Sequence, residues 1–230
     1  MIVMGIDTSG YINAVGAVDG ARVLADNIFP AKTDSLEQIV PNIDDTLKSL
    51  GLSLEDIGGI GVGLGPGSWT GIRVGVTVGK MLAFSTGKPV CGVPTLEALA
   101  FSARHEAELI CPVIAVGAGD AVYAGLYTAG DNGVKRTGEN YTGDVKGLSS
   151  LITRPAVIVG REAPEYARII AQASGIKMKA MDALPSGAAI ASLAASRLDR
   201  GDSDNALALT PLYLKESTAK AFVNKYRIKK

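Results

Sequence analysis

A glycine-rich segment in the first third of the chain constrains the fold more than any other feature. Residues 61–75 read GVGLGPGSWTGIRVG and hold six glycines in fifteen positions. An apolar run precedes the segment and a run with helical spacing follows it, which predicts a buried strand that turns sharply into a helix over 70–86. Ser68 or Thr70 is expected to cap this helix, and the amides of its first turn form a natural place for an anion.

The glycines also admit a simpler interpretation, in which they only let the strand and the helix pack closely. Neither common nucleotide motif is present. The chain has no Gly-Lys-Ser/Thr as a Walker loop requires, and the glycines of 63–71 do not fall in the GxGxxG register. The segment alone therefore predicts a turn that could hold an anion, without a defined nucleotide site.

Along the chain, strand and helix patterns occur in an order that is repeated once. The first half is expected to form three strands, a helix over 35–50, a strand, the helix over 70–86, a short strand and a helix from 95 to about 106. Strands near 112–116, 121–127, 133–136 and 156–159, with helices over 164–173 and 186–200, follow the same order more loosely. This order predicts an α/β protein of two related lobes, each a mixed sheet with helices, with an N-terminal lobe over 1–105 and a smaller, degenerate lobe over 106–230.

The composition is that of an ordinary globular protein, with 47% hydrophobic and 20% charged residues and a formal net charge of zero. This balance gives no overall electrostatic reason to expect a nucleic-acid or membrane partner. The chain has no apolar run long enough to span a membrane, and its first residues lack the pattern of a signal peptide. We therefore expect a cytoplasmic protein with no membrane partner.

Four segments resemble one known family. Residues 65–73, GPGSWTGIR, are similar to the G-P-G-S-[FW]-T-G-[LI]-R signature of bacterial TsaB proteins, also called YeaZ. Residues 6–9 (IDTS), 92–100 (GVPTLEALA) and 211–214 (PLYL) resemble the family's opening motif, its G-V-[SP]-[ST]-L-E-A-L-A segment and its C-terminal P-x-Y-L. The resemblance is firm over about residues 1–105 and thin beyond them.

The resemblance implies an actin-like fold (ASKHA, of the acetate-kinase type) and a role without catalysis. In that role the chain is a scaffold and activator for its paralogue TsaD, with the ATPase TsaE. The complex attaches a threonylcarbamoyl group to the adenosine next to the anticodon of tRNA. TsaD carries the chemistry, so this chain is expected to need no cofactor, with ATP or ADP bound only within the complex. It is also expected to form a homodimer when alone and to meet tRNA indirectly.

The resemblance also points to two groups of residues. The helices over 35–50 and 70–86 are expected to form the partner surface, although sequence alone does not separate interface from core; the residues concerned are Leu36, Ile39, Val40, Ile43, Val76 and Lys80. The candidate anion loop, near which a nucleotide could lie, consists of Asp7, Thr8, Ser9, Gly65, Pro66, Gly67, Ser68, Thr70, Gly71 and Arg73.

No catalytic or metal-binding residue is predicted. The resemblance implies that the catalytic paralogue holds a metal with a pair of histidines on its first helix. The corresponding helix here, over 35–50, has no histidine, and the single histidine of the chain, His105, has no clustered partners. The alternative is a small-molecule kinase of the same fold, in which Asp7 would serve as the first phosphate-site aspartate. In the second lobe Asp120 comes late, because residues 116–123 (VGAGDAVY) depart from the family's D-A-R-x-G-E-V-Y. Asp7 can also be interpreted as a turn residue that satisfies nearby amides.

The C-terminal tail over 215–230 is strongly basic. It holds six lysines and arginines against one acidic residue, so its net charge is +5 and that of the rest of the chain is −5. The tail can be interpreted as a phosphate-contacting segment or as a solvated chain end.

Overall fold

The computed structural model describes residues 1–30, 38–117, 119–130 and 133–214, and it contains two five-stranded sheets. The first has the order β3-β2-β1-β4-β5, with β1 Ile2–Asp7, β2 Ile12–Asp19, β3 Arg22–Pro30, β4 Gly59–Gly63 and β5 Val90–Val93. The second has the order β10-β9-β6-β7-β8, with β6 Leu109–Ala115, β7 Ala121–Gly130, β8 Gly133–Asp144, β9 Ala156–Gly160 and β10 Met178–Asp182. A hairpin at Asp19-Gly20 joins β2 to β3.

The two sheets have the same topology. In each, the first three strands form an antiparallel meander, and the fourth and fifth add in parallel on the other side of the first strand. The repeated order of elements in the sequence thus corresponds to a repeated sheet. The prediction missed β10, a partly exposed edge strand that includes Lys179 and Asp182, because its residues do not form an apolar run.

In the described part of the chain, six α-helices cover the sheets: α1 Ile39–Ser49, α2 Trp69–Thr86, α3 Thr95–Ser102, α4 Val145–Leu148, α5 Ala163–Ser174 and α6 Gly187–Leu198. On one face of the first sheet, Met4 and Ile6 of β1 pack in one core with residues of α1 and α2. On the opposite face, Val3 packs with the alanines of α6. Alternate residues of β1 therefore serve two cores, as the period of a strand requires. The four-residue helix α4, which Asp144 caps, was not predicted.

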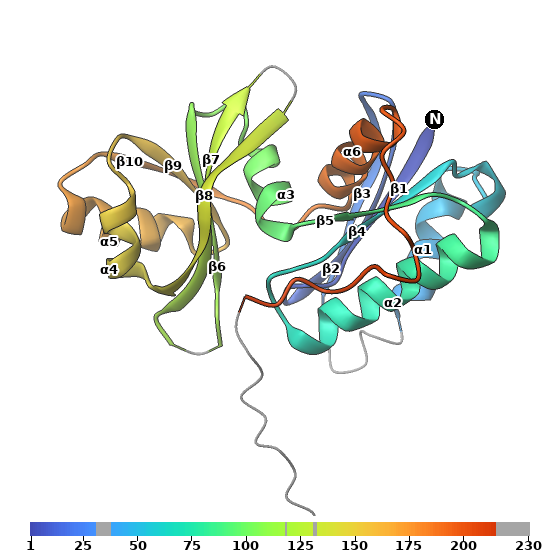
Figure 1. Cartoon of the computed structure of the whole chain (residues 1–230), viewed down its shortest axis with the longest axis horizontal. Coiled ribbons are helices and arrows are strands. Elements are labelled where there is room, and N and C mark those ends of the chain that lie inside the picture. The colour runs from blue at the N-terminus through green and yellow to red at the C-terminus, as the bar shows by residue number, and fades with distance from the viewer. Residues whose placement is uncertain (31–37, 118, 131–132, 215–230) are drawn as a thin grey trace, which may run out of the picture.

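The third helix of each half lies against the other half's sheet. Leu96 and Leu99 of α3 pack with Ile110, Tyr127 and other residues of the second sheet, whereas α6 packs on β1, β2 and β4 of the first. Figure 1 shows α6 beside the blue strands of the first lobe and α3 between the two lobes. The boundary near residue 105 thus separates the two sheets, but α6, which lies in the expected second lobe, packs on the first sheet.

Small residues explain why α6 fits this place. A Cβ built on Gly16 of β2 would lie 2.2 Å from the Ala188 nitrogen, and one built on Gly5 of β1 would lie 2.1 Å from the Gly187 oxygen. The backbone of α6 therefore touches the backbone of the sheet, which only glycine in the strands allows. No helix in the described part of the chain has the length and apolar character needed to cross a membrane.

After α6 the chain returns along the first lobe as a C-terminal strap, residues 202–214. The backbone nitrogen of Asp204 donates to the Val90 oxygen at 2.8 Å, and that of Leu212 donates to the Leu64 oxygen at 2.8 Å. Arg197 of α6 holds the start of the strap through hydrogen bonds of 2.7–3.1 Å to Asp202 and Asp204. The strap, coloured red in Figure 1, runs across α2.

Replacing Arg197 by methionine is expected to loosen the strap. The substitution leaves the half-buried Asp204 carboxylate and the Gly92 oxygen, which Arg197 contacts at 3.0 Å, without this donor. Because the pair is partly screened by solvent, we expect a loss of about 1–2 kcal/mol in the free energy of unfolding. Faster amide hydrogen exchange over 204–212 would report it. Arg200→Met, in the turn directly after α6, is the control, and equal exchange in the two variants would contradict the prediction.

Candidate functional site

The glycine-rich segment forms the turn that the sequence predicts. β4 ends at Gly63, Gly65 has a φ of +89°, the Gly65–Pro66 peptide bond is cis, and α2 starts at Trp69. Ser68 is the N-cap, because its Oγ accepts a hydrogen bond from the Gly71 nitrogen at 3.3 Å. Of the two capping candidates, the structure therefore selects Ser68 over Thr70.

Three glycines bring this turn and α2 against the end of β1. A Cβ on Gly67 would lie 2.1 Å from the Ser9 oxygen, one on Gly71 would lie 2.0 Å from the Thr8 oxygen, and one on Gly75 would meet the Thr8 hydroxyl at 2.2 Å. The Thr8 hydroxyl donates to the Gly71 oxygen at 2.6 Å, and the Ser68 nitrogen donates to the Ser9 oxygen at 2.6 Å. Close packing is therefore a function of these glycines.

Asp7 lies beneath the turn and is fully buried. Its Oδ1 accepts hydrogen bonds from the Ser9 nitrogen at 2.8 Å and the Ser9 hydroxyl at 2.6 Å, and its Oδ2 accepts one from the Thr95 hydroxyl at 2.9 Å. Burial raises the pKa of Asp7 above its ordinary value, and the hydrogen bonds from Ser9 and Thr95 oppose this rise. The interpretation of Asp7 as a residue that satisfies a nearby amide agrees with this geometry.

A cavity of about 890 Å³ lies between the two lobes. Of the predicted anion loop, Ser9, Gly67 and Ser68 line it. The other predicted residues do not line the cavity. Thr70 and Arg73 are exposed at the surface. Five more are buried away from the cavity: Asp7, Thr8, Gly65, Pro66 and Gly71. The structure thus brings the loop to the cavity only at its edge.

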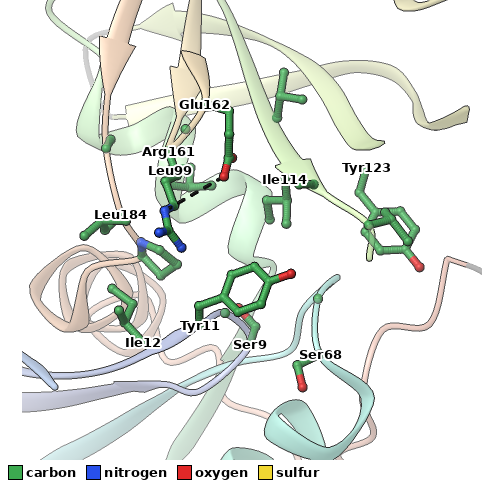
Figure 2. Close-up of a pocket in the computed structure, with 18 of the residues that line it drawn as sticks. Ser9, Tyr11, Ile12, Ser68, Leu99, Ile114, Tyr123, Arg161, Glu162 and Leu184 are labelled. Atoms are coloured by element: carbon green, nitrogen blue, oxygen red, sulfur yellow. Dashed lines mark ion pairs between the residues drawn. The ribbon is translucent and has the colours of Figure 1, made fainter. Parts of the chain in front are cut away.

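The lining of the cavity is mostly apolar and aromatic. Tyr11 reaches into it from the first lobe, and Figure 2 shows its ring near Arg161, with Ile114 and Tyr123 of the second lobe beyond. The Arg161 guanidinium lies 5.6 Å from the centre of the Tyr11 ring and 3.9 Å from the Glu162 carboxylate. Among the described residues, Arg161 and Glu162 carry the only charged side chains of the lining.

Residues expected of a phosphate or metal site are not gathered here. Asp120 is exposed and does not line the cavity, and His105 is exposed in the turn after α3. Within the described ranges, no three histidine, cysteine or acidic side chains are grouped so that they could hold a metal ion. No local sequence pattern indicates Tyr11, Arg161 and Glu162, because Tyr11 meets the other two only when the two lobes are placed together.

The structure changes the set of residues available at the predicted partner surface. Ile39, Ile43 and Val76 are 1–3% exposed and belong to the core of the first lobe. Lys80 donates to the Leu207 and Leu209 oxygens at 3.1 and 2.9 Å and so holds the strap. Val40 is exposed, and Leu36 lies outside the described residues.

Other apolar side chains, on α2 and on the strap beside it, are exposed. Met81 and Phe84 of α2 are 65% and 73% exposed, and Leu207 of the strap is 73% exposed. Because α2 is apolar on more than one face, the sequence pattern did not separate its core face from its outer face.

Known proteins share both the sequence and the architecture. The family model described as "TsaD: tRNA N6-adenosine threonylcarbamoyltransferase" matches residues 28–224. The tRNA threonylcarbamoyladenosine biosynthesis protein TsaB of Bacillus subtilis is 36% identical over 127 residues, 55% of each chain. The solved structure of YeaZ from Pseudomonas aeruginosa is 25% identical, with a TM-score of 0.79 over 93% of this chain and 99% of that one. The chain belongs to the TsaB/YeaZ family.

The sequence match covers only part of the curated relatives. The chain spans about half the length of the curated relatives it matches, 55% in the case of the Bacillus subtilis protein. The ROK hexokinase of Thermus thermophilus, at 17% identity and a TM-score of 0.55 over 88% of this chain and 100% of that one, shares the fold alone. The fold is the actin-like ASKHA fold that the resemblance implies, with two mixed sheets and their helices.

Proposed function

We propose that the chain is a non-catalytic subunit that supports a TsaD-type transferase. In this role it helps to attach a threonylcarbamoyl group to the adenosine next to the anticodon of tRNA in the cytoplasm. TsaD and the ATPase TsaE are its proposed partners, and the chain pairs with itself when they are absent. It requires no cofactor of its own, and ATP or ADP binds only within the complex.

The observation that carries the proposal is an exposed apolar surface on the first lobe. We name it the α1–α2 face and define it by Val40, Met81, Phe84 and Leu207, which are 55–73% exposed. Beside these side chains lies a groove of about 600 Å³ between α1, residues 52–55 and Leu82. Large apolar side chains next to a groove are the usual anchors of a protein interface.

The burial of Asp7 supports a role without catalysis. Asp7, the aspartate that a kinase would place at the phosphates, is enclosed by Ser9, Thr95 and the turn before α2. The family is named for tRNA threonylcarbamoyladenosine biosynthesis, and its model is that of the transferase. A non-catalytic subunit that recognises the transferase through α1 and α2 accounts both for the enclosed Asp7 and for the names of its relatives.

The pairing is tested with charge on the α1–α2 face. Met81→Glu and Phe84→Glu each place a carboxylate where an apolar contact is expected, so each is expected to weaken binding to TsaD by about tenfold or more. Calorimetric titration of TsaD into each variant gives the affinity. Leu151→Glu, at a leucine of the second lobe that is 45% exposed, is the control and is expected to bind as the unmodified chain does. Equal affinity in all three variants would overturn the proposed surface.

Reconstitution separates the proposed function from its alternative. Modification of tRNA by TsaD and TsaE is expected to depend on this chain, and the isolated chain is expected not to bind Mg-ATP. Full modification in its absence, or micromolar binding of Mg-ATP to the isolated chain, would favour a kinase of the same fold instead.

A further inference from the structure

One positive and one negative side chain lie next to each other in the cavity between the lobes. The Arg161 guanidinium and the Glu162 carboxylate are 3.9 Å apart, which is longer than a hydrogen bond. Figure 2 shows the two side chains, joined by a dashed line, beside the ring of Tyr11. We call Arg161 and Glu162 the charge pair of the cavity.

The backbone at the end of β9 places the charge pair. Gly160, the last residue of β9, has a φ of +151°, and a Cβ built on it would lie 2.3 Å from the Val113 oxygen of β6. Only glycine therefore allows the chain to turn this close to β6. The two residues that follow the turn, Arg161 and Glu162, both line the cavity.

The fold makes little use of these side chains. Glu162 is the N-cap of α5 but makes no side-chain capping hydrogen bond, whereas Ser68 and Ser186 cap α2 and α6 through their side chains. Arg161 contacts Glu162 and lies 5.6 Å from the centre of the Tyr11 ring. The side chain of Arg161 is 59% exposed and Tyr11 is 62% exposed, so neither is held by packing. Both charges and the ring are therefore available to a ligand.

The rest of the cavity suits an apolar body. Its volume of about 890 Å³ lies within the range of about 300–1,000 Å³ that is usual for small-molecule pockets. Ile12 and Leu99 line it from the first lobe, and Ile114 and Leu184 line it from the second. A ligand that buries apolar surface here leaves water, so any charge that it carries needs an opposite charge beside it.

The charge pair selects the kind of charge that a ligand can carry. An anion that approaches Arg161 also meets the carboxylate of Glu162, and a cation that approaches Glu162 also meets the guanidinium. A nucleotide brings several negative charges, for which the described lining offers one arginine beside an acidic residue. A ligand with one positive and one negative group close together satisfies both side chains.

We propose that the cavity binds a small zwitterion with an apolar or aromatic body, the chemistry of an apolar α-amino acid. Its carboxylate pairs with Arg161, its ammonium group pairs with Glu162, and its side chain lies along Tyr11 and the apolar lining. This inference goes beyond the proposed function, because it gives the chain a small-molecule ligand apart from its partner surface.

Three probes that share one body test the proposal by calorimetric titration into the full chain. L-Phenylalanine carries both charges, 3-phenylpropionate lacks the ammonium group and 2-phenylethylamine lacks the carboxylate. We expect L-phenylalanine to bind at least tenfold more tightly than either analogue, because each analogue leaves one member of the charge pair without a partner. Equal affinity for the three probes, or no binding of L-phenylalanine, would overturn the proposal.

Variants of the charge pair assign each ligand group to one residue. Arg161→Gln is expected to weaken L-phenylalanine and 3-phenylpropionate about tenfold without weakening 2-phenylethylamine. Glu162→Gln is expected to weaken L-phenylalanine and 2-phenylethylamine about tenfold without weakening 3-phenylpropionate. Glu165→Gln and Arg168→Gln, exposed on α5 outside the lining, are the matched controls. Equal loss of all three probes in either variant, or no loss in both, would contradict the assignment.

The same variants separate this inference from the proposed function. No residue of the α1–α2 face lines the cavity, so Arg161→Gln and Glu162→Gln are expected to pair with TsaD as the unmodified chain does. A chain that pairs with TsaD but does not bind L-phenylalanine overturns the ligand site alone. A chain that binds L-phenylalanine but does not pair with TsaD overturns the proposed function alone.

Discussion

Replacing Gly16 by valine is expected to lower the free energy of unfolding by about 3 kcal/mol or more. The first side-chain carbon would lie 2.2 Å from the Ala188 nitrogen and 2.5 Å from the Gly187 carbonyl carbon, and both atoms are backbone of α6. Backbone does not rotate away as a long side chain does, so α6 must move off the sheet. Urea unfolding followed by circular dichroism measures the loss.

Valine in a strand makes this a demanding test. It favours extended backbone, and replacing glycine reduces the entropy of the unfolded chain, so both local effects act toward stabilisation. Gly130→Val is the control, because a Cβ built on Gly130 at the end of β7 meets no atom within 4 Å. The same change in stability for the two variants would show that contact between α6 and the sheet does not set the requirement for glycine.

For α6, the sequence predicted the helix but not the sheet on which it packs. Its alanine-rich pattern predicted a helix over 186–200, and the structure has Gly187–Leu198. Small residues indicate close packing, but they do not say which sheet is approached. The glycines at positions 5 and 16 complete the contact, and they lie more than 170 residues away in the chain. The packing of α6 on the first lobe could therefore be found only in the structure.

The functional residues divide in a similar way. The turn over 65–68 followed from local rules, which also limited its cap to Ser68 or Thr70, because glycine and capping side chains act on neighbouring backbone. The partner surface could not be predicted in this way. Val76 and Phe84 are both apolar residues of α2, but the side chain of Val76 is buried against the core and that of Phe84 is exposed. A charged residue at Val76 or Ile43 would disturb the core, so it would not test the interface.

Removing the Asp7 carboxylate is expected to cost about 3 kcal/mol in the free energy of unfolding. Asp7→Ala leaves the buried Ser9 nitrogen without its acceptor and opens a small cavity below the turn. The two hydroxyls that also donate to Asp7 can still bond to each other, since Thr95 Oγ1 and Ser9 Oγ lie 3.1 Å apart. Urea unfolding at neutral pH measures the loss, and a variant as stable as the unmodified chain would contradict it.

Asp7→Asn separates the hydrogen bonds from the charge. An amide can accept from Ser9 through its oxygen and donate to the Thr95 hydroxyl through its nitrogen, so the network is kept without a buried charge. Burial raises the pKa of Asp7 above its ordinary value of 3.8, so the folded chain binds this proton more tightly than the unfolded chain does. The contribution of the protonated carboxyl to stability is therefore fully present below 3.8 and is lost as the pH rises through the folded pKa.

The stability of Asp7→Asn relative to the unmodified chain should then increase with pH. Other groups titrate alike in both proteins, so the difference between their free energies of unfolding isolates Asp7. Urea titrations at several values between about pH 4.5 and pH 8 give this difference. A difference that stays flat or becomes smaller as the pH rises would mean that the hydrogen bonds from Ser9 and Thr95 outweigh burial. Asp7 would then be held as an anion beneath the turn, the state that a phosphate or metal site requires.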